Sequence, residues 1–509
     1  MSILELGGQA FGLRDLELLL ESRPPRLEVN EEARRRVQAS REHVEQVERD
    51  GRVVYGINTG FGKLAKVQVQ PDQLRELQIN LLRSHAAGVG EPLSHAVSQL
   101  AFALRIANMA HGLSGVRTSL LDHAVAMFNA GIVPVLPCQG SVGASGDLAP
   151  LAHMALLLVG EGKAWKGREQ VSGSEALSDA GLSAMRLQSK EGLALINGTQ
   201  VSTAILASAL VEARRLAMGA DLAAALTLEA YKGTPTAFDA RIHDARGQLG
   251  QQRVAARMRG LLEGSAIVAS HKDCDRVQDN YCLRCVPQVH GAALDAIDHV
   301  SRVVLREANA VTDNPLVFDN GDILSGGNFH AEPVAMAADF LKIATAELAN
   351  ISERRVELLV NPDLSGLPAF LAPESGVQSG LMIAHVTAAA LVSENKVLAH
   401  PGSVDSIPTS AGKEDHVSMA TSAARHAAMI VQNTRHVLAI EVMTAFHAMA
   451  FETELRPNAA LQGALDLLAE HVPPWTNDRE PAPDIEAVAE LLASGRLQAA
   501  AGLSDDFSA

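Results

Sequence analysis

Two long stretches without glycine or proline most constrain what this 509-residue chain can fold into. They cover residues 334–361 and 413–456. Because glycine and proline are the poorest helix formers, both stretches favour uninterrupted helices, and the second is long enough for a helix of about 60 Å. Residues 201–230 are rich in alanine and leucine and predict another long, largely buried helix. Helices of this length are typical of a multi-helix bundle whose apolar faces continue into a subunit interface.

The first 200 residues have a different texture, because glycine and proline recur throughout them. This pattern predicts short elements, mostly helical with a few short strands, connected by loops. Aromatic residues make up only 3% of the chain, so the core must consist mainly of aliphatic residues, which favours closely packed helices over a β-sandwich. We therefore expect a mainly α protein with a smaller, loop-rich N-terminal domain over residues 1–200. Residues 201–509 are expected to form a long-helix bundle and C-terminal helices.

The charge and composition exclude several classes of protein. The formal net charge of −16 argues against a nucleic-acid partner, since nucleic-acid-binding surfaces are basic. No uncharged apolar run reaches about 18 residues, which argues against a membrane span. The N-terminus carries acidic residues and lacks the basic region of a signal peptide. Four cysteines in a chain of this length do not suggest a disulfide framework. We expect a cytoplasmic protein that acts on a small molecule.

The segment GSVGASGDLAPLAH, residues 140–153, is the most informative motif. Its centre is the tripeptide Ala144-Ser145-Gly146. The tripeptide alone carries little weight, because it arises by chance in roughly one chain in four of this length. A second copy, Ala493-Ser494-Gly495, ends a helical pattern. The first copy stands between glycines and an Asp-Leu-Ala-Pro exit, so its backbone can be unusually tight.

This segment resembles the corresponding loop of the aromatic amino-acid ammonia-lyases and aminomutases. In that family the glycine nitrogen attacks the alanine carbonyl, and dehydration, including loss of the serine hydroxyl, leaves the electrophile 4-methylidene-imidazol-5-one (MIO). The residue types suit this chemistry, because the attacking residue must be unhindered, the alkene needs a leaving group and the first residue must be small. The resemblance implies that Ala144, Ser145 and Gly146 form MIO, with no external cofactor and no metal.

The segment YGINTGFG, residues 55–62, matches the family's mobile glycine-rich loop. The resemblance implies that Tyr55 is the general base that removes the β-proton of the substrate. The ordinary tyrosine pKa is about 10, so this role requires a site that stabilises the phenolate by charge and hydrogen bonding. A phosphate-binding loop at residues 60–63 is disfavoured, because the P-loop spacing and the serine or threonine after the lysine are missing.

Two positions point to histidine as the substrate. In LLRSHAAGVGEP, His85 matches the residue that contacts the substrate imidazole in the histidine-specific members, whereas tyrosine lyases typically have leucine in place of Ala86. In PTSAGKEDHVSMA, Glu414 stands where phenylalanine and tyrosine lyases usually have glutamine. A carboxylate can accept the N–H of an imidazole, whereas beside a phenyl ring it would be buried without a partner. The alternative is that Glu414, at the start of the longest expected helix, is only an acid favoured by the helix dipole.

Three further segments supply residues that surround the substrate in the family. Asn197, in LINGTQ, matches an asparagine that supports the cofactor and the substrate amine. The segment QDNYCLRCVPQVHGA supplies Gln278, Tyr281 and Arg284. The matching tyrosine lies close to MIO, and a guanidinium can hold the amino-acid carboxylate through two parallel hydrogen bonds. Phe329, in SGGNFHAEPVA, matches an aromatic residue near MIO.

The chain departs from the family pattern at two places. Family members commonly have Asn-Gln where this chain has Gly412-Lys413, and a lysine there could pair with Glu414 and alter its charge. Cys282 stands where the histidine-specific pattern often has serine. Cys282 and Cys285 also form a CxxC pair, but the sequence contains no second pair, so a metal or redox site is disfavoured.

The resemblance implies elimination of ammonia from L-histidine to give trans-urocanate, on a long-helix core of the fumarase and aspartase type. It also implies a homotetramer whose active sites draw residues from more than one subunit. Two alternatives remain, a tyrosine or phenylalanine ammonia-lyase or aminomutase of the same family, and a catalytically inactive helical scaffold. Of the three tyrosines in the chain, Tyr55 and Tyr281 are assigned to the site, and Tyr231 is expected to be structural.

Overall fold

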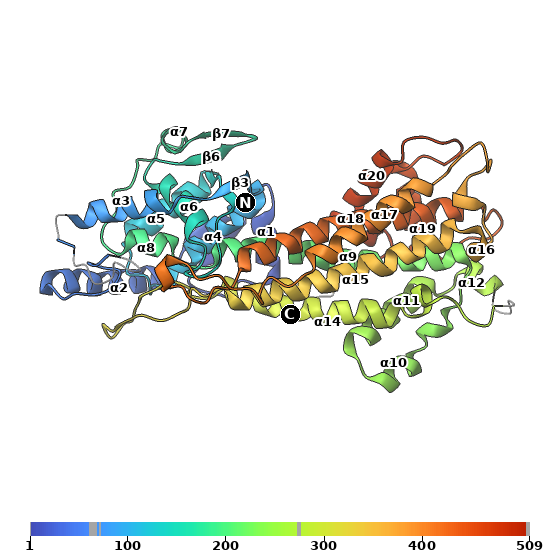
Figure 1. Cartoon of the computed structure of the whole chain (residues 1–509), viewed down its shortest axis with the longest axis horizontal. Helices are drawn as coiled ribbons and strands as arrows, with labels where there is room; N and C mark the ends of the chain where they lie inside the picture. Colours follow the sequence, from blue (N-terminus) through green and yellow to red (C-terminus); the bar gives the residue numbers. More distant parts are fainter. Residues whose placement is uncertain (1, 61–68, 71–72, 272–275, 505–509) are drawn as a thin grey trace.

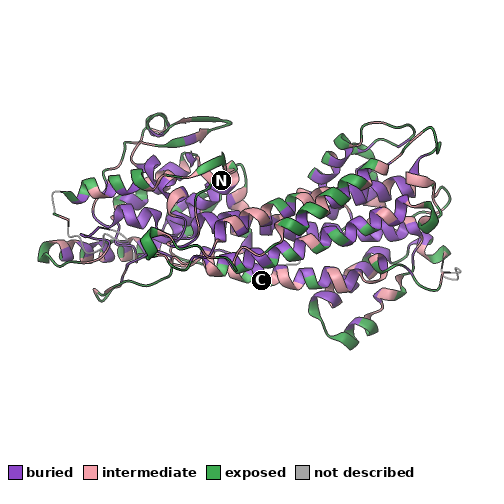
Figure 2. Cartoon of the chain, in the orientation of Figure 1, coloured by how far each residue is buried: buried purple, intermediate pink, exposed green. Residues whose placement is uncertain are grey.

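The computed structural model describes residues 2–60, 69–70, 73–271 and 276–504. Within these residues the chain is mainly helical, which confirms the predicted fold class. Short helices and small sheets from the N-terminal half of the sequence gather at one end of a bundle of long helices (Figure 1). Buried residues run along the centre of both parts (Figure 2).

The N-terminal part contains short helices and three small sheets. Its helices are α1 (Leu13–Leu20), α2 (Glu31–Asp50), α3 (Leu74–His85), α4 (His95–Ala110), α5 (Thr118–Asn129), α6 (Leu148–Leu158), α7 (Gly173–Asp179) and α8 (Glu191–Ile196). Strand β1 (Ile3–Leu6) pairs in parallel with β2 (Arg26–Val29). The antiparallel sheets join β3 (Val89–Pro92) with β5 (Pro137–Gln139), and β6 (Lys163–Lys166) with β4 (Val133–Pro134) and β7 (Glu169–Ser172).

The long helices of the bundle are α9, α14, α15 and α18, which pack side by side (Figure 1). Their bounds are Gln200–Tyr231, Val286–Ala308, Glu332–Val360 and Ala420–Met449. Helix α9 is buried on almost all sides, which agrees with its near-continuous apolar sequence. A buried ion pair connects two of these helices, because Arg355 on α15 donates to both carboxylate oxygens of Glu441 on α18, at 2.6 and 2.8 Å.

Shorter elements cover the bundle and its far end. The helices are α10 (Ala240–Arg246), α11 (Leu249–Leu262), α12 (Ala266–Ser270), α13 (Tyr281–Arg284), α16 (Pro362–Ser365), α17 (Met382–Leu398), α19 (Ala459–His471), α20 (Ala482–Ala493) and α21 (Arg496–Ala500). The 3-10 turns η3 (Pro235–Phe238) and η4 (Ala369–Leu371) belong to this group. The turn η5 (Ser410–Gly412) and the pair of β8 (Leu316–Val317) with β9 (Ile323–Leu324) lie instead with the N-terminal part, where β8 packs against α2. Among the described residues, none of the helices combines the length and the apolar composition that a membrane crossing requires.

The helix predicted over residues 413–456 is shorter than expected. Helix α18 begins at Ala420 and ends at Met449, and its 30 residues are fewer than the 32 of α9. The preceding residue, Met419, has a φ of +57°, a left-handed conformation that a right-handed helix does not continue through. Residues 409–414 form a tight turn closed by a bridge between Thr409 and Glu414. Glu414 therefore lies in a loop, and the interpretation of it as a helix-start acid is wrong.

Candidate active site

The loop of residues 140–147 connects β5 to α6 and is held by segments from distant parts of the chain. The carbonyl of Gly143 accepts hydrogen bonds from the Ser418 hydroxyl at 2.9 Å and from the backbone N–H of Ala331 at 3.3 Å. The carbonyl of Val142 accepts from the N–H of Met419 at 2.9 Å. The predicted Ala-Ser-Gly segment is thus clamped between the start of α15 and the start of α18.

Gly146 lies against the backbone of Gly198, at the start of the turn into α9. Its φ is +72°, and a Cβ atom added at this position would stand 2.1 Å from the Gly198 carbonyl oxygen. The same oxygen accepts the N–H of Asp147 at 2.7 Å. A side chain at position 146 therefore meets both an unfavourable backbone conformation and rigid backbone atoms, so only glycine fits.

Gly146→Ala is expected to lower the free energy of unfolding by about 3 kcal/mol or more, because the clash adds to the strain of the positive φ. The second Ala-Ser-Gly copy offers a matched control, since Gly495 has a φ of +75° with no atom within 4 Å of an added Cβ. Gly495→Ala carries the strain alone and is expected to cost about 1 kcal/mol. Thermal and denaturant unfolding of both variants measures the difference, and equal losses would contradict the close approach to Gly198.

Asp147 is a buried residue of the loop that the sequence analysis missed. Its carboxylate accepts hydrogen bonds from the hydroxyls of Ser141 at 2.8 Å, Ser202 at 2.9 Å and Thr421 at 2.9 Å. Burial raises the pKa of Asp147, and these hydrogen bonds partly oppose that rise. The carboxylate joins the loop to α9 and α18. The sequence signal for Asp147 is that it is a charged residue directly after a glycine-rich, otherwise uncharged segment.

Six of the predicted residues line one pocket of about 530 Å³ beside this loop. They are Tyr55, His85, Ser145, Asn197, Phe329 and Glu414. The pocket is also lined by residues for which the sequence predicted no role, which are Gly60, Leu77, Asn80, Leu81, Ser84, Leu148, Leu193, Ile196, Asn314, Ser410 and Ala411. The six come from six separate segments between residues 55 and 414, so only the folded chain brings them together.

Ser145 makes two direct contacts with predicted site residues. Its hydroxyl donates to Glu414 Oε1 at 2.6 Å, and its carbonyl accepts from the Asn197 amide at 2.7 Å. Asn197 follows the last residue of α8, and its own carbonyl accepts a hydrogen bond at 2.8 Å from the buried guanidinium of Arg105 on α4. Arg105 therefore fixes the peptide that carries the Asn197 side chain.

Glu414 is half-buried and surrounded by hydroxyl groups. Burial alone would raise its pKa, but hydrogen bonds from Ser145, Thr409 and Ser410 outweigh burial, so the pKa lies below its ordinary value of 4.5. Thr409 and Ser410 donate to Oε2 at 2.6 and 2.7 Å. Lys413 is exposed, and within the part of the chain that the structure describes no ion pair joins it to Glu414. Glu414 is therefore a carboxylate at neutral pH.

His85 is the last residue of α3 and lines the same pocket. Burial lowers the pKa of His85 below 6.5, and the nearby charge of Glu414 only partly opposes this. One ring nitrogen, Nδ1, lies 3.1 Å from the Ser84 hydroxyl. The pocket thus presents a mostly neutral imidazole and a carboxylate at neutral pH, a pair that can contact both nitrogens of a second imidazole.

Gln278, Tyr281 and Arg284 do not line this pocket. Tyr281 and Arg284 form the short helix α13, which packs against α14 and α15. The carbonyl of Cys282 in α13 accepts a hydrogen bond from Arg355. At the usual rise per residue, Arg355 lies roughly 35 Å along α15 from the first residue of that helix. Tyr281 is 71% exposed, and Gln278 is exposed as well. Within a single chain these three residues therefore do not join the other six, and their part in the site stays a prediction about an assembly of subunits.

Two other predictions concern tyrosine and cysteine residues. Tyr231 is buried, and the Arg276 guanidinium stands 4.1 Å from its ring centre, in agreement with a structural role. Burial raises the pKa of the Cys282 thiol to about 11, which disfavours a reactive thiolate in the CxxC pair. Residues 61–63 of the predicted glycine-rich loop lie outside the described residues.

Comparisons with known proteins agree with this geometry. The model of the aromatic amino acid lyase family matches residues 12–470. The chain is 53% identical to a histidine ammonia-lyase of Aromatoleum aromaticum over 461 residues, which cover 90% of this chain and 88% of that protein. It matches the crystal structure of histidine ammonia-lyase from Trypanosoma cruzi with a TM-score of 0.91 and 42% identity, covering 99% of this chain and 95% of the other. Tyrosine aminomutase from Streptomyces globisporus gives a TM-score of 0.93 at 34% identity, with 98% of each chain covered.

Proposed function

The chain belongs to the aromatic amino acid lyase family, and from this premise we propose that it eliminates ammonia from L-histidine to give trans-urocanate. It is accordingly a carbon–nitrogen lyase. The observation that carries the choice of substrate is the placement of His85 and Glu414 in one pocket with Ser145. A phenyl ring would leave Glu414 Oε1 without a hydrogen-bond donor once the Ser145 hydroxyl is lost, which is unfavourable in a half-buried site.

Residues 144–146 fit the formation of MIO. Gly146 has no side chain to hinder its nitrogen, and contact with Gly198 holds the segment in a tight turn. Ala144 is buried, where a larger residue would not fit readily. The Ser145 hydroxyl, which dehydration must remove, is held by the Glu414 carboxylate. Once formed, MIO supplies an electrophile that makes ammonia a better leaving group.

Asn197 and Glu414 have distinct tasks in this proposal. The hydrogen bond from Asn197 to the Ser145 carbonyl withdraws electron density from the adjoining carbon atoms of Ser145. Among the described residues, only the Ser145 hydroxyl donates to Glu414 Oε1, so its loss frees this oxygen to accept the N–H of a substrate imidazole. Glu414 and His85 then fix the ring orientation, and Phe329 covers the pocket from another side.

Tyr55 lines the pocket and is assigned the removal of the β-proton. The β C–H bond of an amino acid is barely acidic, so a positioned base is required. Tyr55 is half-buried and follows the end of α2 by a few residues, in a turn whose backbone is held by the Asn58 side chain. This anchoring fixes the backbone that carries Tyr55 at the pocket.

We infer that the active protein is a cytoplasmic homotetramer in which Gln278, Tyr281 and Arg284 complete the site of another subunit. Three observations support the assembly. Tyr281 is exposed although it belongs to a chain with only three tyrosines, and the buried Nε of Arg284 has no hydrogen-bond partner among the residues that the structure describes. Large apolar side chains are also exposed along one face of α15, at Met336, Phe340 and Ile343. In the assembly, Arg284 would hold the carboxylate of the substrate.

A substrate panel tests the proposed function. The purified full-length protein is incubated separately with L-histidine, L-tyrosine and L-phenylalanine, and kcat/KM is obtained from ammonia release. We expect L-histidine to exceed the other two by at least about 100-fold, because its imidazole can contact both Glu414 and His85, whereas L-phenylalanine has no ring donor and the hydroxyl of L-tyrosine lies farther from the amino-acid group. Higher kcat/KM with tyrosine or phenylalanine would contradict the assignment while leaving the family intact. If no ammonia is released from any of the three, recovery of only the unchanged amino acids would favour the inactive scaffold, whereas a β-amino acid product would show an aminomutase.

Glu414→Gln is expected to lower kcat/KM for L-histidine by about 10- to 100-fold, because a charge-assisted hydrogen bond to the imidazole becomes a neutral one. The ratio of kcat/KM for L-histidine to kcat/KM for L-phenylalanine should fall as well. Asp415→Asn removes the neighbouring, exposed carboxylate and is the matched control. If both variants lose the same activity, net charge rather than contact with the substrate explains the effect.

A further inference from the structure

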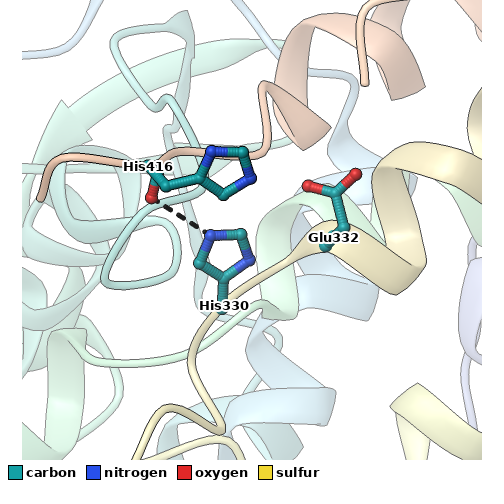
Figure 3. A group of neighbouring side chains, drawn as sticks. All are labelled: His330, Glu332 and His416. Carbon is teal, nitrogen blue, oxygen red and sulfur yellow. Dashed lines mark hydrogen bonds between the residues drawn. The ribbon is translucent and has the colours of Figure 1, made fainter. Parts of the chain in front are cut away.

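His330, Glu332 and His416 form a compact cluster beside the candidate active site (Figure 3). One potential ligand atom from each residue lies within 4.8 Å of the other two. The rings of His330 and His416 are nearly parallel, with 6° between their planes and 5.7 Å between their centres. Two imidazoles and one carboxylate are the donor set of an open zinc site.

A hydrogen bond settles which nitrogen of His330 is available as a ligand. His330 Nε2 lies 3.2 Å from the backbone carbonyl of His416. A carbonyl can only accept, so Nε2 carries the proton in the neutral ring and Nδ1 keeps its lone pair. Metal-binding histidines commonly donate their second N–H to a carbonyl in this way. The second ring nitrogen of His330 and one ring nitrogen of His416 lie on the side nearer the Glu332 carboxylate (Figure 3).

The Glu332 carboxylate has unsatisfied hydrogen-bonding capacity. Its Oε2 atom is buried and accepts no hydrogen bond from the described residues. A buried carboxylate oxygen without a partner is costly, and a cation bound to it would remove that cost. Glu332 is also the first residue of α15, so its position is set by a long, packed helix. The carboxylate is thus both fixed and in need of a partner.

We propose that His330, Glu332 and His416 bind one divalent cation of the zinc type per chain. Zinc bonds to imidazole nitrogen and carboxylate oxygen are about 2.0–2.2 Å long, so side-chain rotations that bring the three atoms somewhat closer would complete the site. His416 is exposed, which leaves the ion open to a water molecule as fourth ligand. The ion is separate from the lyase chemistry proposed above, which needs no metal.

The site would connect the two segments that clamp the 140–147 loop. Ala331, between His330 and Glu332, donates to the Gly143 carbonyl, and Ser418, two residues after His416, donates to the same oxygen. Phe329 and Glu414, which line the pocket, lie one and two residues from the histidine ligands. A bound ion would therefore restrict the relative movement of the pocket walls, and it would stabilise the folded chain by binding to it selectively.

Zinc titration of the full-length protein tests the proposal. The protein is stripped with a chelator, desalted and titrated with zinc chloride in a calorimeter, and thermal unfolding is followed with and without the ion. We expect one saturable site per chain and a higher unfolding midpoint with zinc. Glu332→Gln and His416→Asn are each expected to weaken binding by at least about 100-fold and to abolish the rise in midpoint.

His471→Gln is the control, because His471 is an exposed histidine at the end of α19 and the sequence has 18 histidines that could bind zinc weakly. This variant should bind zinc as the unchanged protein does. Absence of a saturable site, or equal binding by the unchanged protein and both cluster variants, would overturn the proposal. Since the readouts are binding and stability, they do not depend on whether the protein acts on L-histidine.

Discussion

Ser145→Ala is expected to lower kcat by at least about 1,000-fold while the fold and the assembly persist. The substitution removes the hydroxyl whose loss creates the alkene, so no electrophile can form from residues 144–146. It also removes the hydrogen bond to Glu414, but both residues lie at a half-exposed pocket wall, so the effect on stability should be small. Steady-state ammonia release measures activity, and size-exclusion chromatography measures assembly.

Mass spectrometry of the same variant separates a chemical effect from a structural one. The peptide that contains residues 144–146 should weigh two water molecules less than its sequence requires in the unchanged protein, and its full mass in Ser145→Ala. Ser494→Ala alters the second Ala-Ser-Gly copy, where the hydroxyl donates to the backbone carbonyls of Glu490 and Leu491 at the end of α20. This control should keep full activity. Retained turnover in Ser145→Ala would refute the role of the electrophile.

Tyr55→Phe is expected to lower kcat by about 100- to 10,000-fold with little change in KM, because it removes the proposed base but keeps the ring. Initial rates over a range of L-histidine concentrations separate the two constants. Stability should change little, since Tyr55 is only half-buried.

The other two tyrosines provide the comparison. Tyr231→Phe keeps the buried ring that the Arg276 guanidinium covers, and it should leave turnover unchanged. Tyr281→Phe should damage catalysis in the assembled protein, although Tyr281 lies far from the pocket of its own chain. A normal kcat in Tyr55→Phe, or an equal loss in Tyr231→Phe, would contradict the assignment of the base.

The long helices were predictable where packing and local composition agree. Residues 201–230 and 334–361 correspond closely to α9 and α15, because a run of good helix formers there is also buried on the faces that the bundle requires. Residues 413–419 lack glycine and proline as well, yet they are not helical. There, contacts of Glu414 with hydroxyl groups and of Ser418 with Gly143 override helix propensity.

The site was predictable only where a family motif marks a residue. Six marked residues converge in one pocket, but the geometry that supports them depends on residues without a local signal. Arg105, Thr409 and Ser410 are of common types, and only the folded chain brings them to Asn197 and Glu414. The division into domains at residue 200 stays a prediction. The placement of Gln278, Tyr281 and Arg284 in another subunit also stays a prediction, because it concerns an assembly and not one chain.

The zinc cluster had no signature in the sequence. His330 and Glu332 are two residues apart, but His416 lies far along the chain and no short spacing pattern includes all three. The only metal motif that spacing suggested, the CxxC pair, lies on α13 away from this cluster. Ligand sets assembled from distant segments become visible only when side-chain distances are known.

Identification of the products from L-histidine tests the central claim most directly. The full-length protein is incubated with L-histidine, and the mixture is resolved by nuclear magnetic resonance while ammonia is measured in parallel. We predict trans-urocanate and ammonia in equal amounts, both absent with Ser145→Ala. A β-amino acid without free ammonia would show an aminomutase, and unchanged L-histidine would contradict the account.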